Sequence, residues 1–392
     1  MAIRRIDNTE SLLGDPEARR MEAFNLKQGI RAFLYSSRLN LGLVFVPLGL
    51  LAQVLHWPAS AVFTLNFLAI IPLAKLLGYA TEDVSLRVGH ALGGLLNATF
   101  GNAVELIISI FALKRGMIHV VQASMLGSIL SNLLFVLGLS FFLGGLRYPE
   151  QMFNQTAAQT SASMMALSTS SLLLPAAFRY SVVGEKPVDM EHQILGISHA
   201  SAVLLLAIYV GYLIFQLRTH TQFFESEEDH SEETPEMSLS FGILALFLVT
   251  TLIALCAEGL VGAIEGTVES WNISSTFVGL ILLPIVGNAG EHISAVTFAL
   301  KDKVDLTIGI ALGSSLQIAL FVTPLMVIIG WIIGQPMTLC FDLFSTAVLL
   351  ISVLVTNYII NDGASNWLEG AQLLVAYFII AISYFYYPDV EN

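Results

Sequence analysis

The sequence predicts an all-α polytopic membrane protein with about 11 transmembrane helices, arranged as two inverted five-helix repeats plus one extra N-terminal helix. Three observations support this prediction. Hydrophobic residues form 55% of the 392-residue chain and charged residues only 12%, about half the charged share of a soluble domain. Long apolar runs recur along the chain, and a transmembrane helix needs about 20 such residues. A five-residue motif that contains a glutamate occurs twice, each time inside an apolar run.

Eleven apolar runs are candidate transmembrane spans. The first run is short and the fourth is long, which favours tilted or broken helices. The alternation of polar and apolar residues that is typical of membrane strands does not mark these runs, so we expect helices. The candidate spans are 39–55, 58–80, 90–113, 118–145, 155–178, 194–217, 239–264, 273–300, 305–333, 338–360 and 366–387.

The charges between the spans predict the orientation of the chain. Twelve Lys and Arg residues lie on the side of the N-terminal tail and four lie on the opposite side. Cytoplasmic loops carry an excess of Lys and Arg, so we expect the N-terminus and the central loop in the cytosol and the C-terminus outside. Residues 1–38 hold seven of the basic residues and no apolar core, so no cleavable signal peptide is expected.

An internal repeat organises the spans. Residues 101–105 (Gly-Asn-Ala-Val-Glu) return 186 positions later as residues 287–291 (Gly-Asn-Ala-Gly-Glu), and residues 127–136 match 313–322 at the same offset. Repeats of five spans must enter the membrane with opposite orientation, which places a substrate site near the midplane between the halves. The predicted segments are a basic cytosolic tail (1–38), an extra N-terminal helix (39–55), a first five-helix repeat (58–217), an acidic cytosolic loop (218–238), a second five-helix repeat (239–387) and a C-terminal tail (388–392).

The repeated motif carries the candidate chemistry. A carboxylate near the middle of a membrane helix costs a few kcal/mol, so it is rarely there without a function. On a helix, Asn102, Glu105 and Ser109 share one face, as do Asn288 and Glu291 in the second copy. Hard oxygen donors with two carboxylates suit Ca²⁺ better than zinc or copper. The oxygen-bearing side chains that we expect to face them are Ser128, Ser131 and Asn132 in one half and Ser314, Ser315 and Gln317 in the other.

The paired glutamates also suggest a mechanism. Two carboxylates that share a low-dielectric site cannot both stay ionised while the site is empty. A divalent cation needs both negative charges, and its release invites protons onto the same oxygens. Competition between Ca²⁺ and H⁺ for Glu105 and Glu291 is then an exchange reaction. The alternative is structural, with both glutamates hydrogen-bonded to Asn and Ser side chains to hold helices together.

At these residues the chain resembles the Ca²⁺/H⁺ antiporter (cation/proton exchanger) family of the cation/Ca²⁺ exchanger superfamily. The resemblance extends from about Pro58 to the C-terminus, and the Glu-His ending of the second motif is similar to the proton-coupled branch. It implies eleven helices, alternating access, and Glu105 and Glu291 as shared Ca²⁺ and proton ligands. It also implies that Asn102, Asn288, Ser128 and Gln317 line the cation path.

The sequence departs from this family at several positions. Val104 and Gly290 fill a position that often holds a small or hydroxylated residue, which removes an oxygen. Ser131 and Asn132 align with Gln317 and Ile318, so the two halves are chemically unequal. Transport should therefore be asymmetric between the two conformations.

Other ionisable residues are secondary candidates. His292 could relay protons because imidazole titrates near neutral pH, or it could pack between helices. Glu258 could be a carboxylate behind the site or a step in a cytosolic ion path, and a looser repeat pairs it with Lys75. We expect Lys75 to be a helix-end residue that snorkels or pairs. The remaining acidic residues near span ends, which we expect to be solvated, are Glu82, Asp83 and Glu265.

The central loop is strongly acidic between residues 225 and 236. Such a run repels itself and stays solvated, or it concentrates and senses cytosolic Ca²⁺. It lacks the glycine and the regular alternate ligands of an EF-hand. Its acidic residues, the candidates for a cytosolic Ca²⁺ loop, are Glu225, Glu227, Glu228, Asp229, Glu232, Glu233 and Glu236.

The sequence therefore predicts a secondary active transporter that removes cytosolic Ca²⁺ in exchange for H⁺. An Na⁺- or K⁺-coupled Ca²⁺ exchanger of the same fold is the alternative, and a cation channel is less favoured because the chain repeats internally. An enzyme is not expected, since no nucleotide loop, nucleophile constellation or zinc motif occurs. We expect no cofactor and no nucleic acid. We expect Ca²⁺, H⁺ and the lipid bilayer as partners, and the selectivity between Ca²⁺ and Mn²⁺ or other divalent cations stays open.

Two further properties stay open at this stage. The oligomeric state is one of them, with a homo-oligomer among the alternatives. The host membrane is the other, either a prokaryotic plasma membrane or a vacuolar-type membrane.

Overall fold

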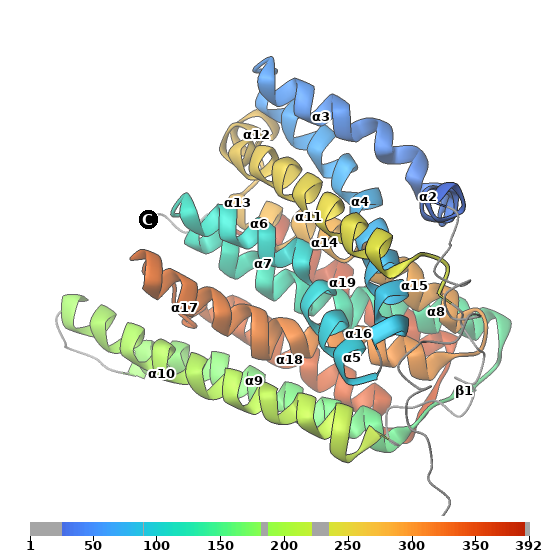
Figure 1. Cartoon of the computed structure of the whole chain (residues 1–392). Coiled ribbons are helices and arrows are strands. Elements are labelled where there is room, and N and C mark those ends of the chain that lie inside the picture. The colour runs from blue at the N-terminus through green and yellow to red at the C-terminus, as the bar shows by residue number, and fades with distance from the viewer. Residues whose placement is uncertain (1–25, 89, 182–186, 222–234, 389–392) are drawn as a thin grey trace, which may run out of the picture.

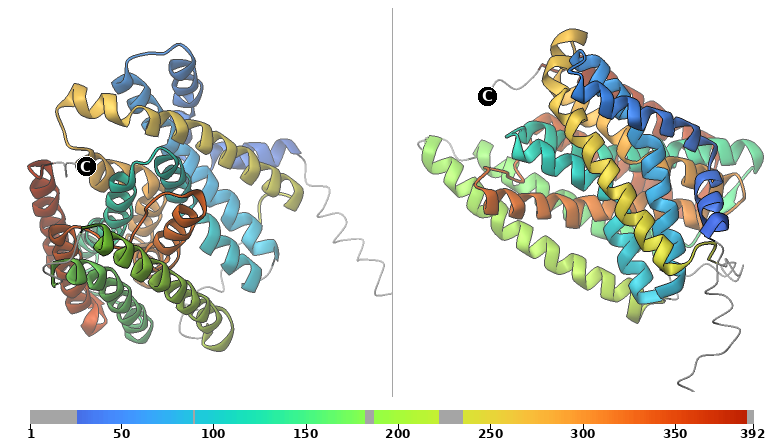
Figure 2. Two further views of the ribbon diagram at one scale, coloured as in Figure 1. Left: turned by 90° about the vertical axis from the view of Figure 1, so that its left-hand side faces the viewer. Right: turned by 45° about the horizontal axis from the view of Figure 1, so that its top comes forward.

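The protein is a bundle of long helices, seen in a computed structural model that describes residues 26–88, 90–181, 187–221 and 235–388. Besides the helices it has one antiparallel pair of short strands, β1 (Gln151–Met152) and β2 (Ala364–Ser365), in which Gln151 is the partner of Ser365. The helices lie roughly along one another, with α9 and α10 at one edge of the bundle and α3 and α12 at the opposite edge (Figures 1 and 2).

The first half of the chain contains two long helices that deviate from regular α geometry without ending. α4 carries Pro72 in its interior, and α7, η2 and α8 form one continuous span in which η2 is π-helical. The elements are α2 (Leu26–Tyr35), η1 (Arg38–Val44), α3 (Phe45–Val54), α4 (Ala59–Val88), α5 (His90–Phe100), α6 (Ala103–Lys114), α7 (Ile118–Leu130), η2 (Ser131–Val136), α8 (Leu137–Arg147), α9 (Gln155–Ser181), α10 (Pro187–Ile214) and η3 (Phe215–Thr219).

The second half repeats these features. One of its π-helical segments, η6, begins 187 residues after η2, close to the offset of the sequence repeat. Such π segments are frequent at functional sites. The elements are α11 (Leu239–Gly262), α12 (Ile264–Trp271), α13 (Ser275–Phe277), η5 (Val278–Leu282), α14 (Leu283–Gly287), α15 (Ala289–Ala299), α16 (Val304–Gln317), η6 (Ile318–Val322), α17 (Thr323–Ile333), α18 (Leu343–Ile359), η7 (Ile360–Asp362) and α19 (Trp367–Phe385).

The number of spans differs from the predicted eleven. Within the described residues, eight helices are long and apolar enough to cross a membrane, or ten if each of two bent pairs is one span. The predicted span 90–113 is not counted among them, because it is divided into α5 and α6, which have 11 and 12 residues and each reach only about 16–18 Å. A bilayer core is about 30 Å thick. The predicted first span, 39–55, starts with the 3₁₀ segment η1 and bends by 91° from the helix before it.

Both copies of the repeated motif interrupt their helix at asparagine. Asn102 (φ −106°, ψ 26°) separates α5 from α6, and Asn288 (φ −88°, ψ 9°) separates α14 from α15. The predicted spans 90–113 and 273–300 are therefore each built from more than one helix. Irregular backbone at membrane depth is tolerated where protein or a water-filled cavity surrounds it. The breaks place Glu105 in the first turn of α6, and Glu291 takes the same place in α15.

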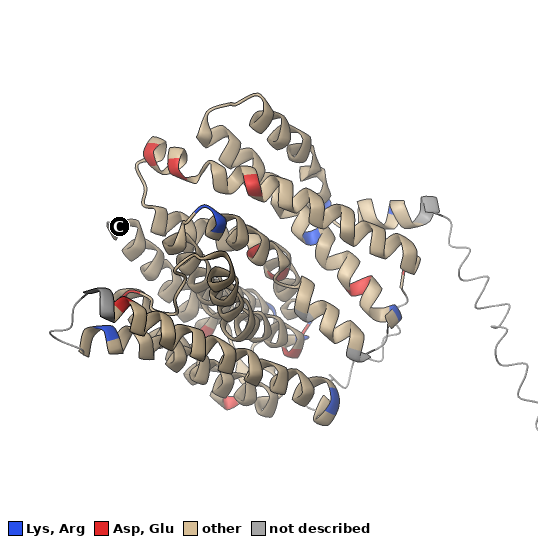
Figure 3. Ribbon diagram, turned by 60° about the vertical axis from the view of Figure 1, so that its left-hand side comes forward, with Lys and Arg blue, Asp and Glu red and all other residues tan. Residues whose placement is uncertain are grey.

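The span 118–147 forms the centre of the bundle. In its most apolar stretch of 18 residues, 72% of the residues are buried, compared with 22% for α19. Gly127 permits this packing, because a Cβ there would collide with the backbone carbonyl of Leu280 in η5. The equivalent helices α4 and α11 pack against each other. Most of the long helices are uncharged along their middle, and Lys, Arg, Asp and Glu gather toward the helix ends (Figure 3). This distribution of charged residues is typical of helices that are surrounded by lipid.

Candidate ion-binding site

The two helix breaks bring Glu105 and Glu291 to one place. Glu105 is 2% exposed, and the Glu291 carboxylate lies close enough to interact with it electrostatically. Asn288 stands between them. With its amide nitrogen turned toward the glutamates, Asn288 donates to Glu105 Oε1 at 2.5 Å and to Glu291 Oε2 at 3.2 Å. One amide therefore links the carboxylates of the two sequence motifs.

Backbone packing makes this approach possible. A Cβ at Gly287 would collide with Glu105 Oε1, so only glycine lets α14 lie directly against the carboxylate. Each glutamate also stands at a helix N-terminus, where the peptide dipoles favour negative charge. Glycine at position 287 thus lets the backbone approach a carboxylate closely.

A chain of polar contacts connects the halves beside the glutamates. Asn102 Nδ2 donates to Gln317 Oε1 at 2.6 Å, and Ser314 Oγ donates to Asn102 Oδ1 at 2.9 Å. Asn132 Nδ2 donates to Ser314 Oγ at 2.9 Å. Ser314 and Asn132 also contact the Glu291 carboxylate by their side chains. The structure thus unites five of the predicted site residues in one network.

Several oxygens of this region have no hydrogen-bond partner in the described part of the chain. They are buried, and a buried polar atom left unpaired costs about 1–3 kcal/mol. Carboxylate, hydroxyl and amide oxygens together are the donor set that Ca²⁺ accepts, with six to eight ligands in flexible geometry. The unpaired atoms are Glu105 Oε2, Ser109 Oγ, Ser128 Oγ and Asn132 Oδ1.

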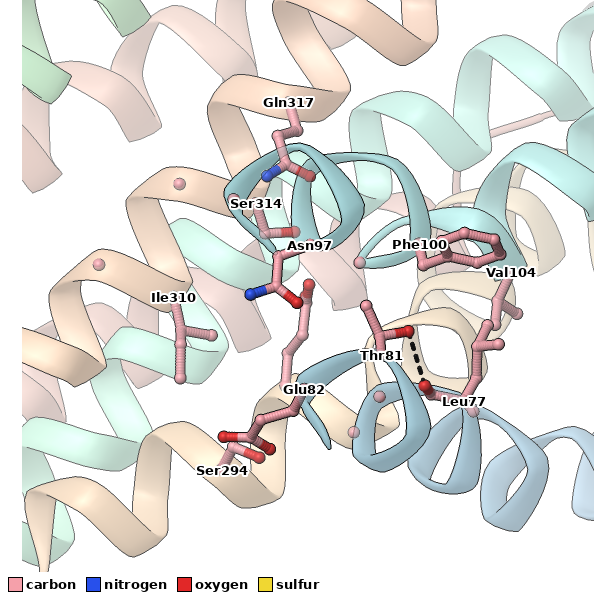
Figure 4. A pocket seen from close by; sticks show the side chains of 18 of the residues that line it. Leu77, Thr81, Glu82, Asn97, Phe100, Val104, Ser294, Ile310, Ser314 and Gln317 are labelled. Atoms are coloured by element: carbon pink, nitrogen blue, oxygen red, sulfur yellow. Dashed lines mark hydrogen bonds between the residues drawn. The ribbon is translucent and has the colours of Figure 1, made fainter. Parts of the chain in front are cut away.

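A cavity of about 600 Å³ reaches Glu291 from one face of the bundle. Its walls come from α4, α5, α10, α15 and α16. In Figure 4, Gln317 and Ser314 are drawn toward one end of the cavity, and Glu82 and Ser294 toward the other. Lys301, which follows α15, also lines the cavity. The cavity therefore opens on the side of the bundle where the described residues 216–217 and 301 lie.

His292 and Ser131 lie apart from the cavity. Ser131 Oγ is 3.2 Å from His292 Nε2, and the His292 ring meets Phe135 edge to face with centroids 5.5 Å apart. Neither residue is among those that line the cavity. In this arrangement His292 of α15 packs against η2, while its neighbour Glu291 faces the cavity.

Glu258 does not join the site. It is exposed, it does not line the cavity, and it stands in the last turns of α11. That end of α11 contacts α3, since Gln53 Nε2 donates to the Leu255 carbonyl. A role for Glu258 in a cytosolic ion path therefore has no support from the cavity, whose lining does not include this residue.

Asp83 is buried, although we predicted it to be solvated. It is 5% exposed and accepts hydrogen bonds from the backbone nitrogens of Glu236 at 2.6 Å and Met237 at 3.2 Å. Tyr79 Oη adds a bond to Glu236 Oε2 at 2.7 Å. The end of the central loop is thereby attached to α4. The predicted Ca²⁺-loop residues 225–233 lie outside the described residues, while Glu82 and Glu265 are exposed, as predicted.

Lys75 is a cavity residue that the sequence reasoning placed wrongly. The predicted span ended at residue 80, which put Lys75 near a helix end. α4 instead continues to Val88, so Lys75 lies in its middle. Its Nζ donates to Ser294 Oγ at 3.1 Å, and both residues line the cavity. A lysine inside an apolar run was the available signal.

Known proteins resemble this chain over most of its length. The family described as "Sodium/calcium exchanger protein" matches residues 59–218 and 241–386. A vacuolar calcium ion transporter of Schizosaccharomyces pombe is 49% identical over 374 residues, which cover 95% of this chain and 90% of that protein. A Ca²⁺/H⁺ antiporter of Synechocystis sp. is 45% identical over 366 residues, covering 89% and 97%.

Solved structures resemble it as well. The structure of the Ca²⁺/H⁺ antiporter protein YfkE is 37% identical, covers 91% of this chain and 99% of that chain, and superposes with a TM-score of 0.75. The structure of the H⁺/Ca²⁺ exchanger CAX, at 17% identity and a TM-score of 0.67, shares the fold.

Proposed function

This chain belongs to the sodium/calcium exchanger protein family and exchanges Ca²⁺ for H⁺, and from that premise we propose that Glu105 and Glu291 are the carboxylates for which both ions compete. One observation supports the assignment most directly: the Asn288 amide reaches both carboxylates at once. Two negative charges held that close together can share a single divalent cation.

The proposed Ca²⁺ ligands are oxygen atoms around this pair. The unpaired Glu105 Oε2 and Ser128 Oγ support this assignment, since each is buried and ready to accept a cation without breaking a hydrogen bond. The Asn102–Ser314–Asn132 chain would hold the remaining oxygens in place around the ion. The full proposed set is Glu105, Glu291, Asn102, Asn288, Ser128, Ser131, Asn132, Ser314 and Gln317. Of these, Ser131 must exchange its contact with His292 for the ion.

Proton coupling follows from the charge of the site. A bound Ca²⁺ balances both carboxylates, and so do two protons. With neither bound, two negative charges would remain at membrane depth, which costs several kcal/mol. A carrier that crosses only when this charge is balanced must exchange one ion for the other.

The direction of transport is also part of the proposal. The cavity opens on the side of the central loop, which the excess of Lys and Arg assigns to the cytosol. Glu291 would therefore collect Ca²⁺ from the cytosol and release it across the membrane. The bundle is a multi-pass membrane protein. Its host membrane is then a prokaryotic plasma membrane or a vacuolar-type membrane.

Coupling to Na⁺ is not favoured. Relatives that are 42–49% identical carry the names Ca²⁺/H⁺ antiporter, vacuolar cation/proton exchanger and vacuolar calcium ion transporter. A structure of a sodium–calcium exchanger, at 19% identity and a TM-score of 0.51, shares the fold alone. The internal repeat also speaks against a channel built from several identical subunits.

The test is Ca²⁺ uptake into proteoliposomes under an imposed pH gradient, with and without Na⁺. Ca²⁺ uptake by the wild type should increase with the pH gradient and should not depend on Na⁺. Glu105→Gln and Glu291→Gln should abolish uptake, because each removes a charge that Ca²⁺ needs. Glu265→Gln, an exposed carboxylate outside the cavity, is the matched control and should transport normally. Uptake that survives either site substitution would show that the glutamates are structural.

A further inference from the structure

Lys75 is a charged group on the cavity wall that the proposed exchange does not use. It lies about 24 Å along α4 from the first residue and about 20 Å from the last, too far for its side chain to reach either end. Its ammonium donates to Ser294 Oγ at 3.1 Å. Ser294 follows Glu291 by one turn of α15, and both line the cavity.

Lys75 has no carboxylate in direct contact with its ammonium among the described residues. Among the described residues, the charged side chains that line the cavity are Lys75, Glu82, Glu291 and Lys301. Glu82 interacts with Lys75 electrostatically from two turns further along α4. No carboxylate of that part of the chain lies within 4.0 Å of Lys75 Nζ. A neutral hydroxyl, rather than a partner carboxylate, therefore holds the ammonium beside the ion path.

We propose that Lys75 is a resident counter-cation of the ion path, which weakens Ca²⁺ binding on the cavity side and so sets the affinity of the exchanger there. This inference rests on the proposed function of Glu105 and Glu291. A fixed positive charge lowers the free energy of the two carboxylates when no ion is bound to them. It also raises the free energy of a Ca²⁺ that moves in, and both effects reduce affinity.

Weaker binding has a use in an exchanger. Each ion must leave the carboxylates before the other can bind, so the unoccupied pair is an obligatory intermediate on the cavity side. A nearby ammonium stabilises that intermediate at membrane depth, where screening by salt is limited. Conduction through a site requires binding strong enough to load it and weak enough to unload it. Lys75 supplies the weakening without occupying the site.

The test separates the charge of Lys75 from its hydrogen bond. Lys75→Met removes both, Lys75→Arg keeps the charge, and Ser294→Ala keeps the charge but removes the acceptor. Binding of radioactive Ca²⁺ to the purified full-length protein gives the affinity, and initial rates in proteoliposomes with Ca²⁺ at the cavity face give the half-saturating concentration and the maximal rate.

The expected result is a split between affinity and rate. Lys75→Met should lower the half-saturating Ca²⁺ concentration about fivefold or more and reduce the maximal rate. Lys75→Arg and Ser294→Ala should stay within about twofold of wild type. High KCl should leave most of the difference between wild type and Lys75→Met in place, because salt screens a buried charge only weakly. Lys75→Gln, which also removes the charge, is measured in parallel and replaces Lys75→Met in the test if that variant aggregates.

Two results would overturn the proposal. The first is a Lys75→Met or Lys75→Gln protein that binds Ca²⁺ no more tightly than wild type. The second is a Ser294→Ala protein that reproduces the shift, which would make the hydrogen bond the cause. Glu291→Gln is included to keep the two proposals distinct. If Glu291→Gln binds Ca²⁺ like wild type, the proposed Ca²⁺ site is wrong. If Ca²⁺ binding depends on Glu291 but not on the Lys75 ammonium, only the proposed role of Lys75 is wrong.

Discussion

Ser314 Oγ donates to Asn102 Oδ1 at 2.9 Å, although the two residues stand 212 positions apart in the chain. Asn102 belongs to the first Gly-Asn motif, and Ser314 belongs to the second Gly-Ser motif. The bond therefore joins the Gly-Asn motif of the first half to the Gly-Ser motif of the second half. Such a cross-connection is what an inverted repeat requires of a site that both halves build.

The opposite cross-connection is incomplete. Ser128 occupies in the first half the position that Ser314 holds in the second, yet its Oγ has no partner among the described residues. Asn288, the counterpart of Asn102, points its amide at Glu105 and Glu291. This difference between the halves accompanies a cavity that reaches the site from one face.

Replacing Asn102 by leucine should weaken Ca²⁺ binding at least tenfold, because it removes the contacts to Gln317 and Ser314 that order the site. Calcium titration of the purified protein measures the effect. Asn40→Leu is the matched control, since the Asn40 amide donates to the Phe33 and Leu34 carbonyls at the edge of the bundle. It should lower thermal stability and leave the Ca²⁺ affinity unchanged. Equal losses of affinity in both variants would contradict the prediction.

Alanine at Gly287 should abolish transport, because the new Cβ would occupy the space of Glu105 Oε1. The carboxylate must then move away from Glu291, or α14 must shift. Gly309→Ala is the control, since Gly309 also lines the cavity but has no atom within 4 Å of its added Cβ. Proteoliposome uptake is the measurement. A Gly287→Ala protein with normal uptake would refute the close approach.

Ca²⁺ affinity should fall as the pH is lowered, because each proton that binds a carboxylate removes a charge that Ca²⁺ needs. Protonation thus opposes Ca²⁺ binding, and the Ca²⁺ affinity is highest at a pH where both carboxylates are ionised. Each displaced proton should weaken binding about tenfold per pH unit. Comparing wild type with Glu105→Gln over a pH series should reveal one proton fewer in the variant. An identical pH slope in both proteins would exclude Glu105 as a proton site.

Asp83→Asn should destabilise the protein by about 1.5–3 kcal/mol, since a charged acceptor of two backbone N–H groups is replaced by a neutral amide. The thermal unfolding midpoint in detergent should fall accordingly. Glu269→Gln alters an exposed carboxylate and should not change it. If Asp83→Asn unfolds at the wild-type temperature, the attachment of the central loop to α4 contributes no stability.

Much of the site could be predicted from residue types and their spacing. Glu105 and Glu291 stand in apolar runs at a constant offset, and a buried carboxylate is costly wherever it lies. That argument needs no coordinates, because it depends on composition and periodicity along the chain. The polar partners Ser314, Asn132 and Gln317 followed from the same repeat.

Other features depend on contacts between distant segments. The breaks at Asn102 and Asn288 could not be read from apolar runs, because an interrupted helix at membrane depth is stable only where neighbouring helices or a cavity accommodate the freed backbone groups. Asp83 looked solvated from its place near a span end, yet the backbone of the central loop buries it. The Lys75 side chain lies on the cavity wall, where its ammonium donates a hydrogen bond to Ser294 of α15. Hydropathy describes each segment alone, whereas burial, hydrogen bonding and the open face of the cavity arise from how the segments pack.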